Sequence, residues 1–436
     1  MNKGLKSYTK QLTNQIGSAT VNVNLFKNDA NMHITIPLLS TTGLSAFSAS
    51  LVYNHQSKGN TGIFGKGFYL NYYAKIVTNG NSVTIQNADG STDNYTIGEW
   101  NAETQMKAVN VSGHIEFEDR DGNKRIYEST SGNYPKKLVM KSGDEITVNI
   151  GQTSGSITNG KGDEIRFVFD SKGKVISAKY LYNDKVHNLV SFGYANDNLC
   201  TIQYENADGS VCGGVLISYQ ATSISVSDNM TDYQCKFLFD SYGRVVSVVD
   251  GFGTSFKAKH TTVLTYGTNT TKVTDWTGSY VEYYFDSEGI PLYEMNSDGY
   301  VVETDYDSKS KTLIAQSNPF LLNGQKNYFD GMSPDNFALS DVTKTKVTVT
   351  DTKWKNIVGS TAYRFKHQGT GSGSISFEVP VDCVATDSLT AIMWVKQLTN
   401  FSTDNYVRID LQIGDQDSDF LKKPVVDSNY ELVLLG

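Results

Sequence analysis

Apolar and polar residues alternate along most of the 436-residue chain, in short runs separated by Gly, Asn, Asp and Ser. Such alternation places every second side chain on one face of a β-strand. We find no long stretch with the helical period of 3.6 residues. The pattern predicts an all-β protein whose first strands lie in the runs VNVNLF (21–26), MHITIPLL (32–39), SASLVYN (48–54) and GFYLNYYAKI (67–76).

One pentapeptide recurs between these alternating runs. It reads FDSKG at 169–173, FDSYG at 239–243 and FDSEG at 285–289, with a degraded copy, YDSKS, at 306–310. Asp is favoured at the first position of a type I turn, and Gly at the fourth, where it accepts a positive φ. The motif therefore predicts hairpin tips, whose structural turn residues are Asp170, Gly173, Asp240, Gly243, Asp286 and Gly289.

Further hairpins are predicted before the recurring motif. The segments SVTIQNADGSTDNYTI (82–97) and HIEFEDRDGNKRIYES (114–129) each carry an Asp-Gly turn signal. From residue 163 an aromatic residue marks each unit at intervals of roughly 20–25 residues, with weaker markers where Asp is missing. The markers are Phe169, Tyr194, Tyr219, Phe239, Tyr266, Phe285 and Tyr306. This period predicts stacked hairpins that form one curled antiparallel sheet.

Changes in the pattern of apolar, polar and turn residues divide the chain into four parts. We expect a flexible N-terminus (1–20), an N-terminal β region (21–162), the repeat sheet (163–318) and a β-sandwich (319–436). In the last part, longer strands alternate cleanly after a turn-rich break at 316–335. About a hundred residues form this part, so the sandwich is expected to be of the jelly-roll type, complete or lacking its last strands.

Charge and hydropathy narrow the classes of partner. The net charge is −8 and no basic stripe occurs, which argues against nucleic acid and anionic membrane surfaces. No apolar run approaches the roughly 20 residues of a membrane span. The first residues lack the apolar core of a signal peptide. The strand-like ending YELVLLG favours a segment of a longer protein over export by another route.

Few residues have the spacing that catalysis or metal binding requires. The six histidines are scattered and no Ser-containing nucleophile elbow is present. The four cysteines form no CxxC pair; Cys200 and Cys212 either pair across two strands or remain isolated buried thiols. His55 is expected in a strand at the mouth of a hairpin. The chain is therefore predicted to be non-enzymatic.

Two ligand sites are candidates in the last part of the chain. Asp415, Asp417 and Asp419 are two residues apart and either hold a structural Ca²⁺ or form a solvated acidic loop. Trp354 lies among polar residues and either stacks on a sugar ring or packs at the rim of the sandwich. No other metal or cofactor is expected.

The aromatic-Asp-x-x-Gly turn followed by an apolar run resembles the YD repeat of Rhs-type proteins. FDSYGRVVSVVDGFG (239–253) matches best, DGYVVETDYDSKSKTL (298–313) loses its second Gly, and FDSEG is followed by Ile290 where Arg is usual. Residues 34–76, with Gly65, Gly67 and Phe68, resemble the N-terminal segment of the same proteins. The C-terminal part resembles carbohydrate-binding jelly rolls.

The resemblance covers roughly residues 34–315 and implies an extracellular or cell-surface location. In that family the repeats wind into a β-sheet shell around a toxic domain or form an adhesion scaffold. The Asp-containing segment that closes such a shell is not found here. The implied partners are the downstream part of the same polypeptide and surface or wall polysaccharide.

Three functions follow as hypotheses. The first is a non-enzymatic scaffold of YD repeats within a larger Rhs-type protein, which predicts a continuous sheet. The second is a carbohydrate-binding module on a repeat spacer, which predicts exposed aromatic rings. The third is a β-rich glycan-active enzyme, which requires two facing carboxylates roughly 5–10 Å apart.

Overall fold

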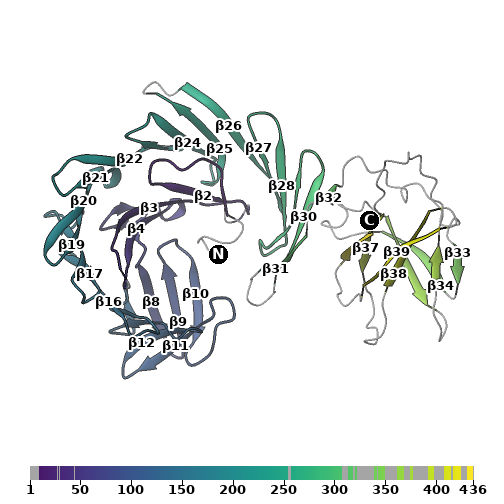
Figure 1. The fold of residues 1–436 in the computed structure, drawn as a ribbon, viewed down its shortest axis with the longest axis horizontal. Coiled ribbons are helices and arrows are strands. Elements are labelled where there is room, and N and C mark those ends of the chain that lie inside the picture. Colours follow the sequence, from purple (N-terminus) through teal and green to yellow (C-terminus); the bar gives the residue numbers. More distant parts are fainter. Residues whose placement is uncertain are drawn as a thin grey trace. The chain divides into compact units, whose positions relative to one another are not determined.

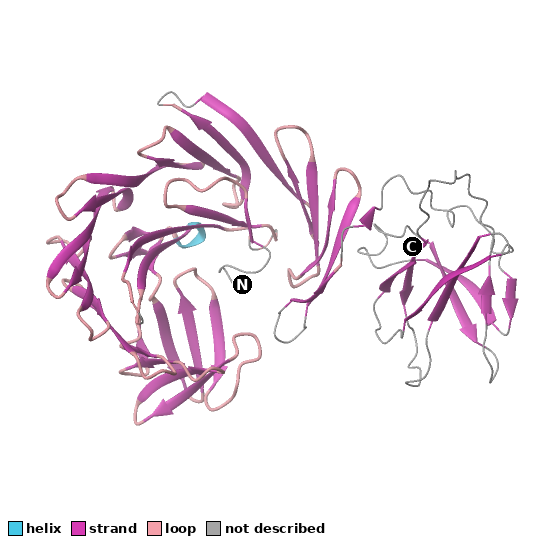
Figure 2. Ribbon diagram, viewed as in Figure 1, coloured by secondary structure: helices cyan, strands magenta, loops and turns pink. Residues whose placement is uncertain are grey.

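The structure is a computed structural model of the whole chain. It describes residues 9–26, 28, 30–43, 45–253, 257–306, 313–317, 320–321, 338–340, 342–348, 361–367, 374–376, 391–396, 407–413, 416–423 and 430–435. The chain divides into two compact units, Met1–Gly324 and Gln325–Gly436. The described elements are β-strands apart from one short 3-10 helix, so the all-β prediction is confirmed (Figure 2). No helix among the described residues has the length and apolar character needed to cross a membrane.

A 21-stranded antiparallel sheet, called here the repeat sheet, dominates the first unit. Each strand pairs with its sequence neighbours, except that β13 pairs with β15, and β30 also pairs with β32. The strands are β11 (Met106–Val111), β12 (His114–Asp119), β13 (Lys124–Tyr127), β15 (Lys137–Val139), β16 (Glu145–Ile150), β17 (Gly155–Thr158), β18 (Asp163–Phe169), β19 (Val175–Tyr182), β20 (Lys185–Ala195), β21 (Asn198–Asn206), β22 (Val211–Gln220), β23 (Ser223–Asp228), β24 (Tyr233–Phe239), β25 (Val245–Phe252), β26 (Lys257–Tyr266), β27 (Thr270–Thr274), β28 (Tyr280–Phe285), β29 (Pro291–Asn296), β30 (Tyr300–Tyr306), β31 (Leu313–Gln316) and β32 (Phe320–Leu321).

The sheet confirms the predicted chain of neighbouring hairpins between 163 and 315. It also begins earlier than the repeat motif, because β11 to β17 belong to the same sheet. The expected division at 162/163 is therefore a change of sequence pattern within one continuous sheet. In Figure 1 the repeat sheet curves around the first strands of the chain, which are drawn in purple.

Those first strands form a five-stranded antiparallel sheet, called here the inner sheet, in the order β1-β2-β3-β4-β7. Between β4 and β7 lie η1 (His55–Ser57) and the small hairpin β5–β6. The strands are β1 (Thr9–Gln11), β2 (Thr20–Asn24), β3 (Met32–Ser40), β4 (Ser48–Asn54), β5 (Thr61–Gly62), β6 (Gly65–Lys66) and β7 (Phe68–Leu70). A third sheet has the order β10-β9-β8-β14, with β8 (Ala74–Asn79), β9 (Ser82–Asn87), β10 (Thr92–Thr96) and β14 (Ser131–Gly132).

The expected flexibility of residues 1–20 is wrong for the described part of that range. Residues 9–11 form β1, which pairs with β2. Ile16 and Ala19 are fully buried in the core of the first unit. Two apolar side chains without exposed surface hold this segment in place, although its polar composition suggests a loose tail. Residues 1–8 lie outside the described residues.

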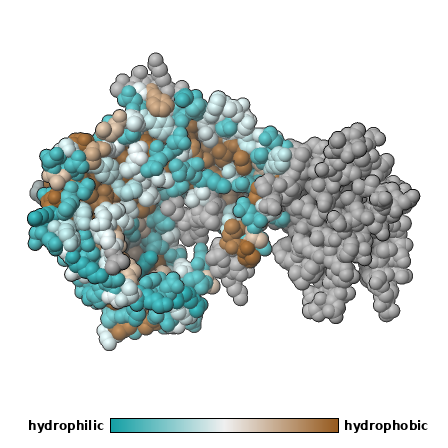
Figure 3. Space-filling view, in the orientation of Figure 1, coloured by the Kyte–Doolittle hydropathy of each residue, from teal (hydrophilic) through white to brown (hydrophobic). Residues whose placement is uncertain are grey.

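The main core lies between the inner sheet and the repeat sheet. One continuous cluster of buried side chains joins Val21, Ile34 and Leu51 of the inner sheet to Val190 and Phe237 of the repeat sheet. A smaller cluster joins the four-stranded sheet to β11–β13. The face of the first unit seen in Figure 3 is mostly hydrophilic, with small apolar patches, as expected when the apolar face of each strand is turned inward.

In the second unit the described strands form four antiparallel pairs. They are β33 (Ala338–Ser340) with β36 (Ser374–Ser376), β34 (Val342–Thr348) with β35 (Thr361–His367), β37 (Ala391–Lys396) with β40 (Tyr430–Leu435), and β38 (Val407–Ile413) with β39 (Gln416–Lys423). These pairs agree with an all-β unit. The jelly-roll arrangement stays a prediction.

Candidate functional site

The three complete copies of the pentapeptide form the same turn. Gly173, Gly243 and Gly289 have φ of 76°, 78° and 85°, in the left-handed region that glycine accepts without strain. In the first copy, the Asp170 carboxylate accepts the backbone N–H groups of Lys172 and Lys174, both at 2.8 Å. Asp240 and Asp286 accept the corresponding bonds. The geometry agrees with the hairpin-tip interpretation.

Two connections of the inner sheet, between β2 and β3 and between β4 and β7, touch these turns through aromatic rings. The His55 ring stacks on Phe239, with centroids 3.8 Å apart and planes 4° apart. Phe26 packs on Phe285, with centroids 5.6 Å apart. Phe239 and Phe285 are the first residues of their pentapeptides, so the motif also supplies contact points for the inner sheet. His55 lies in η1, not in a strand as expected.

The β5–β6 hairpin fastens two neighbouring turns of the repeat sheet. Its Phe64 is fully buried against Phe167 and Phe192, with ring centroids 5.9 and 5.5 Å away. The Lys66 N–H donates to the Asp197 carbonyl at 2.9 Å, and the Val175 N–H donates to the Ile63 carbonyl at 2.9 Å. This hairpin is therefore hydrogen-bonded to the strand that follows one turn and to the turn before β21.

The backbone of this hairpin passes so close to Asp197 and Tyr53 that its Gly-x-Gly element has no room for larger residues. Gly65 has φ of 91°, and a Cβ there would lie 2.6 Å from the Asp197 carbonyl oxygen. Gly67 has φ of 74°, and its Cβ would lie 2.8 Å from the Tyr53 ring. Both positions require glycine for backbone conformation and for space.

Tyrosine hydroxyls link successive hairpins, a feature that the sequence analysis missed. Tyr194 donates to the Val175 carbonyl at 2.6 Å, Tyr219 to the Leu199 carbonyl at 2.9 Å, and Tyr266 to the Val245 carbonyl at 2.6 Å. Each bond spans 19 to 21 residues. These three tyrosines are the weaker repeat markers that lack Asp, so their spacing was the available signal. Two of these bonds reach Val175 and Val245, the first residues of the strands after turns whose Asp carboxylates are also hydrogen-bonded, so the hydroxyls add a second repeated contact.

A thiol, a carboxylate, a tyrosine hydroxyl and an imidazole form one cluster on the core face of the repeat sheet. The Tyr233 hydroxyl donates to Asp250 at 3.3 Å, and the Cys235 thiol donates to the Tyr233 hydroxyl at 3.4 Å. Nδ1 of His260 lies 3.1 Å from an Asp250 oxygen. Burial raises the pKa of the Cys235 thiol to about 11. A buried thiol with a raised pKa is a poor nucleophile, so this cluster does not have the properties of a Cys–His catalytic pair.

The cysteines do not form the pair that was considered. Cys200, Cys212 and Cys235 are free. Cys200 lies in β21 and Cys212 in β22. The register pairs Gln203 with Gly214, so the two cysteines do not lie opposite each other. Cys212 is exposed, which corrects the expectation of a buried thiol for that residue.

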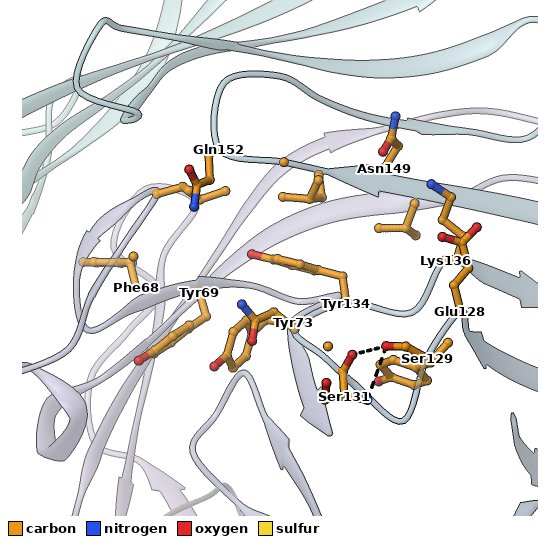
Figure 4. A pocket seen from close by; sticks show the side chains of 18 residues that line it. Phe68, Tyr69, Tyr73, Glu128, Ser129, Ser131, Tyr134, Lys136, Asn149 and Gln152 are labelled. Carbon is orange, nitrogen blue, oxygen red and sulfur yellow. Dashed lines mark hydrogen bonds between the residues drawn. The ribbon is translucent and has the colours of Figure 1, made fainter. Parts of the chain in front are cut away.

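A pocket of about 420 Å³ lies where the inner sheet, the four-stranded sheet and the repeat sheet meet. The ends of β7, β13 and β16, the turn after β7 and the β14 segment contribute its walls. Four tyrosines are among its lining residues: Tyr69, Tyr73, Tyr127 and Tyr134. The rings of Tyr69 and Tyr73 lie 4.6 Å apart, and those of Tyr73 and Tyr134 lie 5.6 Å apart at 85° (Figure 4). Burial raises the pKa of the Tyr134 hydroxyl above its ordinary value.

Polar side chains surround these rings. Figure 4 shows Gln152 on one side of Tyr134, with Asn149, Lys136 and Glu128 on another. Glu128 is the single carboxylate among the lining residues. The pocket therefore lacks the pair of carboxylates that glycoside hydrolysis commonly uses. Its chemistry is that of a binding site with aromatic faces and amide groups.

The predicted ligand residues in the second unit lie at or beyond the limits of the described structure. Trp354 and Asp415 are outside the described residues. Asp417 and Asp419 belong to β39, whose side chains are not described. Within the described part of the chain, no three His, Cys, Asp or Glu side chains are grouped as metal ligands. The Ca²⁺ and sugar-stacking expectations at these positions stay predictions.

Comparisons with known proteins found similarity in structure alone. No protein-family model matches the sequence, and no curated protein matches it. A porin-like protein from Bacteroides uniformis is 11% identical, with a TM-score of 0.23, over 56% of this chain and 92% of that chain. The TcdB2-TccC3 structure is 9% identical, with a TM-score of 0.28, over 68% of this chain and 22% of that chain.

A form of TcdB2-TccC3 without its hypervariable C-terminal region is 10% identical, with a TM-score of 0.26, over 67% of this chain and 19% of that chain. The chain thus spans about a fifth of the length of the TcdB2-TccC3 structures. TM-scores this low do not identify a fold family.

Proposed function

We propose that this chain is a segment of a non-enzymatic extracellular or cell-surface scaffold of the Rhs type. The observation that supports the proposal is the single 21-stranded sheet, built of neighbouring hairpins whose turns are fastened to an inner sheet. Stacked units of this kind bury a continuous core that no single hairpin could bury alone. Such a wall suits enclosure or presentation of another part of the protein.

The use of the polar residues in the first unit supports a structural role. The turn carboxylates bind their own backbone amides, and the repeated tyrosine hydroxyls bind backbone carbonyls. The Cys235 thiol is buried with a raised pKa. These groups stabilise the fold, which is the role expected of them in a scaffold. By resemblance to YD-repeat proteins, the partner of the repeat sheet would be the remainder of the same polypeptide.

Surface proteolysis of intact source cells tests the location. Cells that express the full-length protein are treated with a protease that does not enter them, and the chain is detected with an antibody. We expect cleavage on intact cells, while a cytoplasmic marker protein stays whole. Protection of the chain on intact cells, with cleavage after lysis, would contradict the proposed location.

The absence of catalysis is tested separately with the purified chain. Neutral and acidic polysaccharides are incubated with it, and new reducing ends are measured against a heat-treated sample. We expect no release above that control. Sugar release that follows the folded protein through chromatography would favour the glycan-active enzyme instead of the scaffold.

A further inference from the structure

The tyrosines of the pocket in the first unit make none of the hydrogen bonds that fasten the turns of the repeat sheet to the β5–β6 hairpin. We propose that this pocket binds a ring of a neutral saccharide. The site is separate from Trp354, at which the sequence predicted sugar stacking. The proposal does not rest on the scaffold function, because a scaffold with or without a glycan site has the same wall.

The rings of Tyr69, Tyr73 and Tyr134 provide faces in different orientations. Tyr69 and Tyr73 are tilted by 39°, and Tyr134 stands at 85° to Tyr73. All three side chains are half-buried, so parts of their surfaces line the pocket and remain open to a ligand. The C–H face of a sugar ring is apolar and packs on such aromatic surfaces. A volume of about 420 Å³ falls in the range of small-ligand sites.

The polar groups around the rings are free to bind hydroxyls. Within the part of the chain that the structure describes, the Tyr134 hydroxyl has no hydrogen-bond partner, and neither do the side chain amides of Asn149 and Gln152. Tyr134 is half-buried and its hydroxyl is not among the enclosed polar atoms without a partner, so it is open to a ligand in the pocket. The Tyr134 hydroxyl is protonated at neutral pH, as an ordinary tyrosine is, and can donate; burial raises its pKa further. Amides both donate and accept, as a polyhydroxylated ligand requires.

The charge of the pocket selects against acidic ligands. Lys136 and Glu128 are the charged side chains in its lining, and their formal charges cancel. A phosphate or carboxylate ligand would gain little from such a site and would lose hydration on entering it. A neutral sugar loses no charge hydration. Because Glu128 is the single carboxylate in the lining, we expect the pocket to bind a sugar without hydrolysing it.

Calorimetric titration of the full chain tests the proposal. The probes are hexasaccharides of β-1,4-linked glucose, β-1,3-linked glucose, mannose and N-acetylglucosamine, with a hexasaccharide of galacturonic acid as the charged comparison. We expect at least one neutral probe to bind, and the acidic probe to bind more weakly. No binding of any neutral probe at millimolar concentration would overturn the proposal.

Variants then locate the site. Tyr134→Phe keeps the ring and removes the hydroxyl, and should weaken binding roughly fivefold. Tyr73→Ala removes a ring face and should weaken it about tenfold. Gln152→Ala changes an exposed side chain and should weaken binding without loss of folding, which circular dichroism verifies. Trp276→Ala, a matched loss of an aromatic ring that is 62% exposed outside the pocket, should leave binding unchanged.

Trp354→Ala separates the two sugar sites. Retained binding in this variant, together with loss in the pocket variants, supports the pocket. Loss of binding in Trp354→Ala with no effect of Tyr134→Phe, Tyr73→Ala and Gln152→Ala would overturn the proposal. Sugar binding at the pocket by a chain that proves to be cytoplasmic would contradict the proposed location but not this inference.

Discussion

At the scale of single residues, the turn pentapeptide carries two roles in one motif. Its Asp and Gly set the local turn, and its first aromatic residue receives a ring from the N-terminal part of the chain in the second and third complete copies. The local role follows from nearest neighbours in sequence and was predictable. The contacts with His55 and Phe26 join residues more than 180 positions apart, and no local pattern encodes them.

Glycine substitutions separate these two roles. Gly289 and Gly278 have φ of 85° and 92°, so alanine is strained at both positions. A Cβ at Gly289 would also lie 2.5 Å from Phe26, whereas a Cβ at Gly278 meets nothing within 4 Å. We expect Gly278→Ala to cost about 1 kcal/mol of unfolding free energy. Gly289→Ala should cost at least ~2 kcal/mol because the Phe26 ring must also move. Urea unfolding of both variants measures the difference, and equal losses would contradict the Phe26 contact.

The stacked histidine predicts a pH dependence of stability. Burial, and then the charge of Lys58, lower the pKa of His55 to about 3 from its ordinary 6.5. The unfolded chain therefore binds a proton at this residue more readily than the folded chain between pH 6.5 and about 3. The stabilisation by neutral His55 is complete above pH 6.5 and is lost as the pH falls, by at most ~1.4 kcal/mol per pH unit.

Replacement of the histidine checks this sign. His55→Phe keeps a ring against Phe239 and cannot titrate, so its unfolding free energy should fall less steeply between pH 6.5 and 4 than that of the natural chain. The same replacement at His187, which is exposed, serves as the matched control and should leave the slope unchanged. An unchanged slope in His55→Phe would mean that His55 is not buried as described.

At the scale of elements, hairpins are joined by more than the strand ladder. The hydroxyls of Tyr194, Tyr219 and Tyr266 each reach the first or second residue of the strand that follows an earlier turn. A residue-by-residue reading identified these tyrosines as incomplete copies of the motif. Their partner is a backbone carbonyl, which carries no sequence signal, so the bond itself was not predictable.

Removal of one such hydroxyl should loosen the contact between two hairpins. Tyr266→Phe leaves the ring in place and deprives the Val245 carbonyl of its donor. We expect a loss of about 1 kcal/mol in unfolding free energy. Tyr242→Phe, at a tyrosine that is 80% exposed, is the control and should change stability by less than the error of the measurement. Equal stability of the two variants would show that the bond contributes nothing.

At the scale of the first unit, the inner sheet and the repeat sheet share one core. The same buried cluster contains Phe64 of the β5–β6 hairpin and Cys235 of β24. A shared core predicts that the two sheets unfold together, because buried residues of the inner sheet such as Ile34 and Leu51 lie in the cluster that they share with the repeat sheet.

The buried thiol reports on this coupling. In a variant that keeps Cys235 and carries serine at the other three cysteines, reaction with a thiol reagent should be slow in the folded state, because the side chain has no exposed surface. Phe64→Ala should cost ~3–5 kcal/mol and accelerate the reaction of Cys235. Ile314→Ala, at a side chain that is 61% exposed, should neither cost this stability nor accelerate the reaction of Cys235. Unchanged labelling in a destabilised Phe64→Ala variant would indicate independent sheets.

Alternation of apolar residues and the Asp-x-x-Gly turns were enough to predict strands, hairpin tips and their pairing with neighbours, because these features depend on contacts a few residues apart. Placement of the N-terminal strands on the repeat sheet depends on contacts such as Phe64 with Phe192, which local patterns do not specify. The pocket also depends on contacts between residues far apart in the sequence. Tyr69 and Tyr73 are near in sequence, and only the meeting of three sheets brings Tyr134 and Tyr127 to them.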